Sequence, residues 1–160
     1  MTTPASGTIS LNNILTELGA SGTISLNNSS VRSLAQVPSG SISLSNLYFK
    51  SIFSMVAGVI NSGANAYGYD FSSVGSIDHQ FFAGNLISSI VTFGNSSSFS
   101  IAINANLSVN FFNYISIPQL SATFQTSSAG FSGGSTSTWT WFGYAGPYFA
   151  NGNTYTIYTG

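Results

Sequence analysis

Residues 99–111 read FSIAINANLSVNF, and apolar and polar side chains alternate through the whole stretch. The odd positions from Phe99 to Phe111 are all apolar, whereas the even positions are Ser or Asn except for Ala102. Side chains of a β-strand point alternately to opposite faces, so this pattern indicates a strand with one buried face. Because 13 residues exceed the usual length of a strand, we expect a bend or turn near residues 104–106.

Stretches of similar character lie on both sides of this one. We expect strands at residues 86–93, 120–126, 137–142 and 154–158, separated by clusters of Gly, Asn and Ser. Several short strands, each with one apolar face, close most simply as an antiparallel β-sandwich or a jelly-roll-like domain. A short helix at residues 52–61 is expected to lead into this domain.

The composition changes abruptly near residue 52. All 23 aromatic residues lie from Tyr48 onward, whereas both basic residues and Glu17 lie at or before Lys50. This change predicts two regions in a mainly β protein. Residues 1–52 would form a small docking region of strands and short helices, and residues 53–160 an aromatic-rich β-sandwich.

The first region contains an internal repeat. SGTISLNN at residues 6–13 recurs unchanged at residues 21–28, and SGSISLSN at residues 39–46 is a looser third copy. Alternation of Ile and Leu with Ser predicts a short strand in each copy, and the Asn pair can cap a following helix. Short helical turns are expected at residues 14–18 and 31–35.

No single copy of the repeat can bury its apolar face alone, so the copies must stack on one another or dock onto something larger. The candidate docking side chains are the Ile and Leu of each copy: Ile9, Leu11, Ile24, Leu26, Ile42 and Leu44.

Charged residues make up only 3% of the 160-residue chain, with a formal net charge of -1, against about 25% in typical soluble proteins. Two basic residues cannot form the basic surface that nucleic acids or anionic membranes require. A free monomer would lack the charge repulsion that keeps proteins dispersed, so we expect a homo-oligomer covered by copies or partners. Cysteine is absent, and the apolar stretch at residues 52–60 is too short to span a membrane. The first residues have neither a basic region nor an apolar run, so we expect no secretory signal there.

Few side chains are available for catalysis. A serine triad would need His79 as base, and its neighbour Asp78 would point to the opposite face of a strand, which leaves Asp70 or Glu17 to orient it. Asp70 and Asp78 are the one carboxylate pair in the β domain that a small polysaccharide hydrolase could use. Asp78 and His79 supply two metal ligands at most. We therefore expect no enzyme activity, no cofactor and no metal site.

Aromatic side chains near the C-terminus offer a binding hypothesis. Trp139 and Trp141 share one face of a predicted strand, and Tyr144 and Tyr148 follow shortly after. Flat rings beside Asn and Ser are typical of a surface that binds glycans. Large aromatic residues at a period of two are, however, more often part of a core or a subunit contact.

The N-terminal third resembles a segment of tailed-bacteriophage virion proteins. In these proteins Ser-Gly-x-Ile-Ser-Leu-Asn units alternate with short helices and end in an aromatic-Lys-Ser element. The corresponding parts here are residues 6–13, 21–35 and 39–51, the last ending in Tyr48-Phe49-Lys50-Ser51, with Phe49 where the family often has Gly. The resemblance implies a non-catalytic structural role in a virion, in its tail, baseplate or fibre. Other virion proteins would be partners, a trimer is expected by analogy with phage fibres, and a carbohydrate-binding host-recognition module is the alternative.

Overall fold

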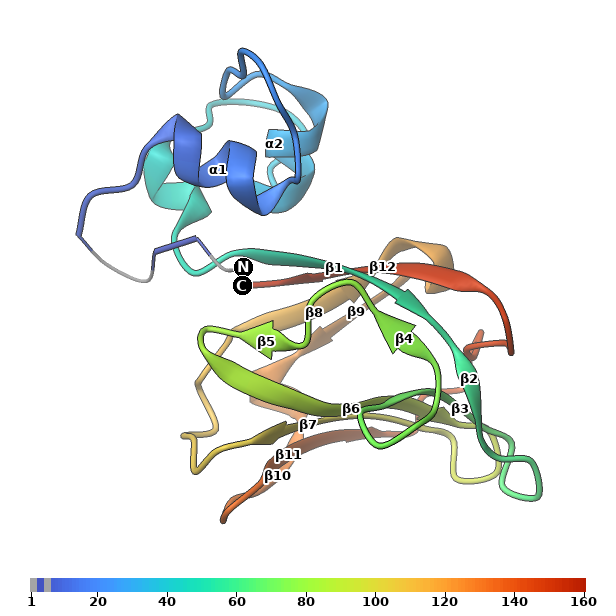
Figure 1. Cartoon of the computed structure of the whole chain (residues 1–160). Coiled ribbons are helices and arrows are strands. Elements are labelled where there is room, and N and C mark those ends of the chain that lie inside the picture. The colour runs from blue at the N-terminus through green and yellow to red at the C-terminus, as the bar shows by residue number, and fades with distance from the viewer. Residues whose placement is uncertain (1–2, 5–6) are drawn as a thin grey trace.

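The computed structural model describes residues 3–4 and 7–160, which form a small helical lobe on a two-sheet β-sandwich (Figure 1). The lobe contains α1 (Leu11–Glu17), α2 (Ser29–Ala35) and the 3-10 turn η1 (Leu44–Leu47). Apolar side chains from all three copies of the repeat pack into one cluster, so the copies stack on one another. The buried members of the cluster are Ile9, Ile14, Ile24, Val31, Leu34, Ala35 and Leu47.

The expectation of a strand in each copy of the repeat was wrong. In the first copy Ser10 caps α1 in a reciprocal box: its Oγ accepts from Asn13 N–H, and Asn13 Oδ1 accepts from Ser10 N–H at 2.9 Å. In the third copy Asn46 Oδ1 likewise accepts from Ser43 N–H at 2.9 Å, while Asn46 N–H donates to the backbone oxygen of Ser43 at 3.1 Å. In the second, Asn28 is the cap instead and accepts from Ser30 N–H at 2.9 Å.

Identical octapeptides thus begin their helices at different positions, because the residues that follow them differ. Ile14 comes directly after the first copy and is fully buried in the lobe. After the second copy two serines precede Val31, the first buried residue of α2. Burial of the apolar side chains therefore decides where each helix begins, and the two expected helical turns are confirmed.

The β region consists of two antiparallel sheets. The five-stranded sheet has the order β4 (Ser76–Ile77), β1 (Ser51–Val56), β12 (Thr154–Thr159), β8 (Tyr114–Ile117), β9 (Ala122–Gln125). The seven-stranded sheet has the order β10 (Gly130–Ser132), β11 (Ser137–Phe142), β7 (Ser98–Asn104), β6 (Asn85–Phe93), β3 (Ala66–Asp70), β2 (Gly58–Asn61), with β5 (Phe81–Phe82) also paired to β6. Two 3-10 turns complete the fold: η2 (Pro118–Leu120) and η3 (Thr126–Ser128).

The predicted β class is confirmed, as are the four flanking strands within a few residues at their ends. The alternating stretch enters β7, which ends at Asn104, and turns away there as expected. The helix expected at residues 52–61 was wrong, because this segment forms β1 and β2. Phe53, Met55 and Ala57 are buried while Ser54 and Val56 are exposed, so the burial has a period of two. Val56 and Val59 are exposed apolar residues, and they hid this period in the sequence.

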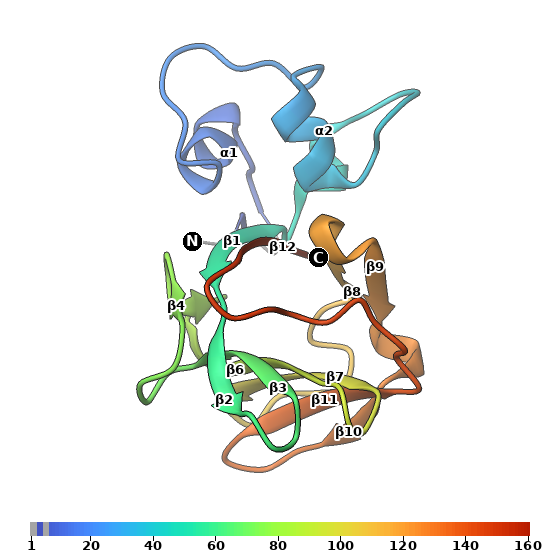
Figure 2. The ribbon, with the colours of Figure 1, turned by 90° about the vertical axis from the view of Figure 1, so that its right-hand side faces the viewer.

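The core of the sandwich lies between the two sheets. Phe99 and Trp141 from the seven-stranded sheet pack on Phe124 of β9, whose ring lies 4.1 and 5.4 Å from theirs between centroids, and Trp139 is buried in the same core. The lobe lies over the outer side of β1 and β12, and the seven-stranded sheet lies at the opposite end of the molecule (Figures 1 and 2). None of the helices in residues 3–4 and 7–160 has the length and apolar character needed to cross a membrane.

Candidate functional site

The lobe joins the sandwich through a short segment that ends in β1. Thr3 N–H donates to Lys50 O at 2.9 Å, and Lys50 N–H donates to Thr3 Oγ1 at 2.7 Å. Phe49 takes φ 56°, a conformation that favours Gly, and its ring packs on Phe82 and Phe111 at 5.3 and 5.4 Å. Packing of the Phe49 ring on Phe82 and Phe111 thus offsets the strain of this backbone conformation.

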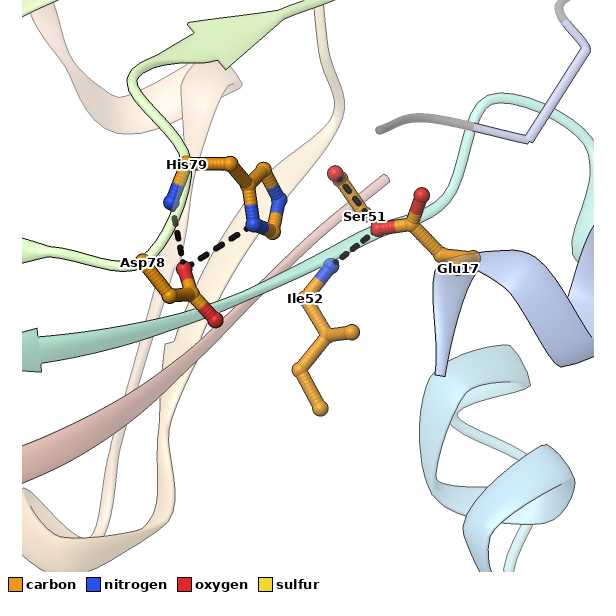
Figure 3. Close-up of polar contacts among 5 residues, drawn as sticks. All are labelled: Glu17, Ser51, Ile52, Asp78 and His79. Atoms are coloured by element: carbon orange, nitrogen blue, oxygen red, sulfur yellow. Dashed lines mark hydrogen bonds and ion pairs between the residues drawn. The ribbon is translucent and has the colours of Figure 1, made fainter. Parts of the chain in front are cut away.

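Glu17 ties the lobe to the sandwich (Figure 3). It is the last residue of α1 and only 5% exposed. Its Oε1 accepts from Ser51 Oγ at 2.8 Å and from Ile52 N–H at 2.9 Å, at the start of β1. Loss of solvent raises the pKa of this carboxyl above its ordinary 4.5, although both hydrogen bonds act in the opposite direction.

We predict that Glu17→Gln removes part of the pH dependence of stability. Because burial raises the folded-state pKa, the folded chain holds this proton more tightly than the unfolded chain, and stability falls as pH rises from about 4.5 through the folded-state value. Gln keeps an oxygen that accepts both hydrogen bonds and does not titrate. Urea unfolding at pH 4 and pH 7 should therefore show wild type losing stability relative to the variant at the higher pH.

A parallel Glu17→Leu variant controls for the hydrogen bonds. It should be less stable than Glu17→Gln at both pH values, because Ser51 Oγ and Ile52 N–H lose their acceptor. Equal pH slopes in wild type and Glu17→Gln would contradict this account of the carboxyl.

Both basic side chains also serve the fold. Lys50 Nζ donates to Tyr114 Oη at 3.0 Å and lies 4.4 Å from the centre of its ring, and burial lowers the pKa of Lys50. Arg32 donates to Asn27 Oδ1 and to the carbonyl oxygens of Val37 and Gly40. These contacts hold the loop after α2, so the guanidinium is largely used inside the lobe.

The expectation that Asp78 points away from His79 was wrong. β4 ends at Ile77, so the two residues are not on a strand, and Asp78 Oδ1 accepts from His79 Nδ1 at 2.9 Å and from His79 N–H at 2.8 Å (Figure 3). The imidazole packs on Phe53 at 4.6 Å between ring centres. Burial lowers the pKa of His79, while the charge of Asp78 raises it.

A cavity of about 410 Å³ contains Glu17, Asp78 and His79 among its lining residues. The pair Asp78–His79 has the geometry of an oriented base, yet no hydrogen-bond partner of His79 Nε2 is found among the described residues. No group of three or more His, Asp or Glu side chains in that part of the chain is arranged to hold a metal ion. Asp70, the last residue of β3, lies outside this lining, and its Oδ1 accepts from Ser72 N–H at 2.9 Å. The carboxylate pair expected for a hydrolase is therefore not assembled in this cavity.

The six candidate docking residues do not form one exposed surface. Ile9 and Ile24 are buried in the core of the lobe, and Leu26, Ile42 and Leu44 pack partly against it. Of the six, Leu11 is the exposed one, at 37%. The side chains that the sequence offered for docking thus mainly hold the lobe together.

The candidate glycan residues are divided by the fold. Trp139 is fully buried and Trp141 is 5% exposed, so the core interpretation holds for both. Their indole N–H groups donate inside the chain, to Val109 O at 2.8 Å and to Gln125 O at 2.7 Å. Tyr144 and Tyr148 are partly exposed, but their hydroxyls donate to Pro147 O and Tyr144 O.

Sequence reasoning missed the most exposed large apolar side chain. Phe142, the last residue of β11, is 75% exposed. It stands at one end of a shallow groove of about 260 Å³ on the outer side of β10 and β11. The signal was present, because Phe142 falls on the face opposite to Trp139 and Trp141.

A larger cavity, of about 540 Å³, separates α2 from the outer side of the five-stranded sheet. Its lining is mainly Ser, Thr and Gln with Arg32, Tyr158 and two Pro. The lobe is therefore tied down on the side of α1 and stands apart from the sheet on the side of α2.

No family model, curated protein or solved structure matches this chain.

Proposed function

We propose that the chain is a non-catalytic structural protein of a tailed-bacteriophage virion. The observation that carries the proposal is that each of its six acidic, basic and histidine side chains is engaged within the fold. Glu17, Arg32, Lys50 and Asp70 hold backbone or neighbouring side chains, and Asp78 and His79 hold one another. Few reactive side chains remain for catalysis at the surface, so we assign the chain a role in contacts with other proteins.

The two parts divide this work. The lobe carries the segment that resembles phage virion proteins, and we assign to it attachment to the tail, baseplate or fibre. The sandwich has its own core and projects or packs with other copies. This division follows the two separate hydrophobic clusters, to which the neighbouring β1 residues Ile52 and Phe53 contribute from opposite faces of the strand.

The carbohydrate-binding alternative receives less support from the geometry. It required Trp139 and Trp141 to be accessible, and both rings lie in the core. The hydrolase alternative required a cleft with an activated nucleophile or a carboxylate pair. The cavity at His79 is lined by Asp78 and Glu17 but not by Asp70, so the expected pair of Asp70 and Asp78 is not assembled there.

A surface change on the lobe tests attachment. Leu11→Ser removes the one exposed apolar side chain among the six candidates and should reduce the copies of this chain per purified particle about ten-fold, the usual effect of losing an interface anchor. Quantitative mass spectrometry of particles from a genome encoding the variant measures this.

Val109→Ser is the matched control. Val109 is exposed to a similar degree, but it lies on the sandwich, so incorporation should not change. Equal loss with both variants, or no loss with Leu11→Ser, would contradict the assignment of attachment to this face of the lobe.

A further inference from the structure

The two outer sheet faces differ in what covers them. The lobe lies over the five-stranded sheet, whereas no helix among the described residues covers the outer side of the seven-stranded sheet (Figures 1 and 2). Trp139 pairs with Ile101 and faces the core, so Thr138, Thr140 and Phe142 face outward on β11. The sandwich therefore leaves this face of the sheet open to a partner.

The open face carries a projection and a hollow side by side. Phe142, at the end of β11, is 75% exposed and forms one end of a groove whose other lining residues are Gly130, Phe131, Ser132, Thr138 and Thr140. Gly130 leaves room for the Phe142 ring, because a Cβ there would lie 3.2 Å from Phe142 Cε2. The groove has a volume of about 260 Å³, which leaves room for an aromatic side chain.

A projection and a fitting hollow on one face are what a two-fold contact needs, because each copy then presents both halves. We propose that the open face binds a second copy of this chain about a two-fold axis, with Phe142 of each copy seated in the groove of the other. This inference rests on the proposed structural role and names the contact that copies make. It is separate from the three-fold symmetry expected by analogy with fibres.

The charges of this face agree with a second copy as the occupant. One row of paired residues crosses this face from strand to strand, and its members are Ser132, Thr138, Ala102, Ser89 and Asp70. Asp70, at one end, is the single charged residue in this row. Both basic side chains lie in the lobe or its junction. Two such faces meet without like-charge repulsion across their centre, whereas a partner recognised by charge finds nothing to bind.

The area of this open face sets the expected affinity of the dimer. Six neighbouring strands spaced about 4.8 Å apart and about 20 Å long give about 600 Å² per copy. The total of about 1,200 Å² is at the lower limit of specific interfaces. We therefore expect a reversible dimer with a dissociation constant of about micromolar or weaker, strengthened where copies are held close together in a particle.

Sedimentation equilibrium of the full-length chain tests the contact. Wild type should show a reversible monomer–dimer equilibrium. Phe142→Ala, which removes the projection, and Ser132→Trp, which fills the groove, should each raise the dissociation constant at least about ten-fold. Leu11→Ser lies on the lobe and should leave it unchanged.

Mixing the two variants gives the sharpest result. Phe142→Ala keeps the other five lining residues of the groove, and Ser132→Trp keeps Phe142, so a heterodimer recovers one of the two contacts that both homodimers lack. The mixture should dimerise more tightly than either variant alone.

A wild type that is monomeric at every concentration, that forms open polymers, or whose variants are not restored by mixing would overturn the two-fold contact. These outcomes leave the structural role standing if particles still contain the chain. Dimers without incorporation into particles would instead contradict the proposed function and not the contact.

Discussion

Trp139→Ala is expected to destabilise the protein by about 3–5 kcal/mol, the usual cost of removing a buried aromatic side chain. The ring is fully buried and packs on Phe112 and Phe131 at 4.8 and 5.2 Å between centroids. Its N–H also holds Val109 O at 2.8 Å, at the loop that follows β7. Since small domains are stable by about 5–15 kcal/mol, the variant should unfold in much less urea than wild type.

Phe142→Ala is the control for this prediction. It removes an aromatic residue of the same strand that is 75% exposed, and the free energy of unfolding should change by no more than about 0.5 kcal/mol. Urea unfolding of both variants is followed by circular dichroism. Unfolding of Phe142→Ala, which keeps both tryptophans, is also followed by tryptophan fluorescence. If Trp139→Ala were as stable as wild type, the ring would not be core, and the glycan-binding alternative would regain its main residue.

Gly68→Ala is the second substitution with a large expected effect. Gly68 lies in β3 with φ 154°, and a Cβ there would lie 2.0 Å from Ile90 O and 2.9 Å from Val91 Cα, both on the paired strand β6. Neither backbone atom can move without breaking the pairing of β3 with β6. We expect a loss of at least about 3 kcal/mol, or failure to fold.

Gly84→Ala provides the comparison. Gly84 also has a positive φ, of 81°, but a Cβ there would meet no described atom within 4 Å. Gly84→Ala should therefore lower the free energy of unfolding by about 1 kcal/mol, the cost of placing Ala in a left-handed backbone conformation. Thermal unfolding of both variants checks this, and equal shifts in midpoint would show that the close approach of β3 to β6 carries no cost.

Much of the sandwich was predictable because its strands bury one face. The alternation in residues 99–111 and the flanking stretches located β6, β7, β9, β11 and β12. β1 and β2 were missed because Val56 and Val59 are apolar but exposed, which removed the contrast between faces. β5 and β10 are two and three residues long, too short to show a period.

The site was predictable only in part. The sequence could name Glu17, Asp78 and His79, since ionisable residues are so few. It could not show that Glu17 reaches Ser51, because that contact joins residues 34 apart through the fold. Reasoning from the sequence also placed Asp78 and His79 on opposite faces of a strand. That was wrong because β4 ends before Asp78, and the end of β4 is set by its pairing with β1.

The repeat shows the limit of local reasoning most clearly. Eight identical residues begin a helix at Leu11 in one copy and at Ser29, after the motif, in the other. The hydrogen-bonding groups of the motif can cap a helix at either position. The position of the next apolar side chain decides which of the two starts is used. The same packing turned the expected docking residues Ile9 and Ile24 into core.

The account as a whole is tested most directly by a cryo-electron microscopy reconstruction of a phage particle whose genome encodes this chain. We predict density for the two-sheet sandwich at repeated, symmetry-related positions, with the lobe against a neighbouring virion protein. Purified particles that lack the chain, while the free polypeptide turns over a substrate as a single copy, would contradict a role based on contact.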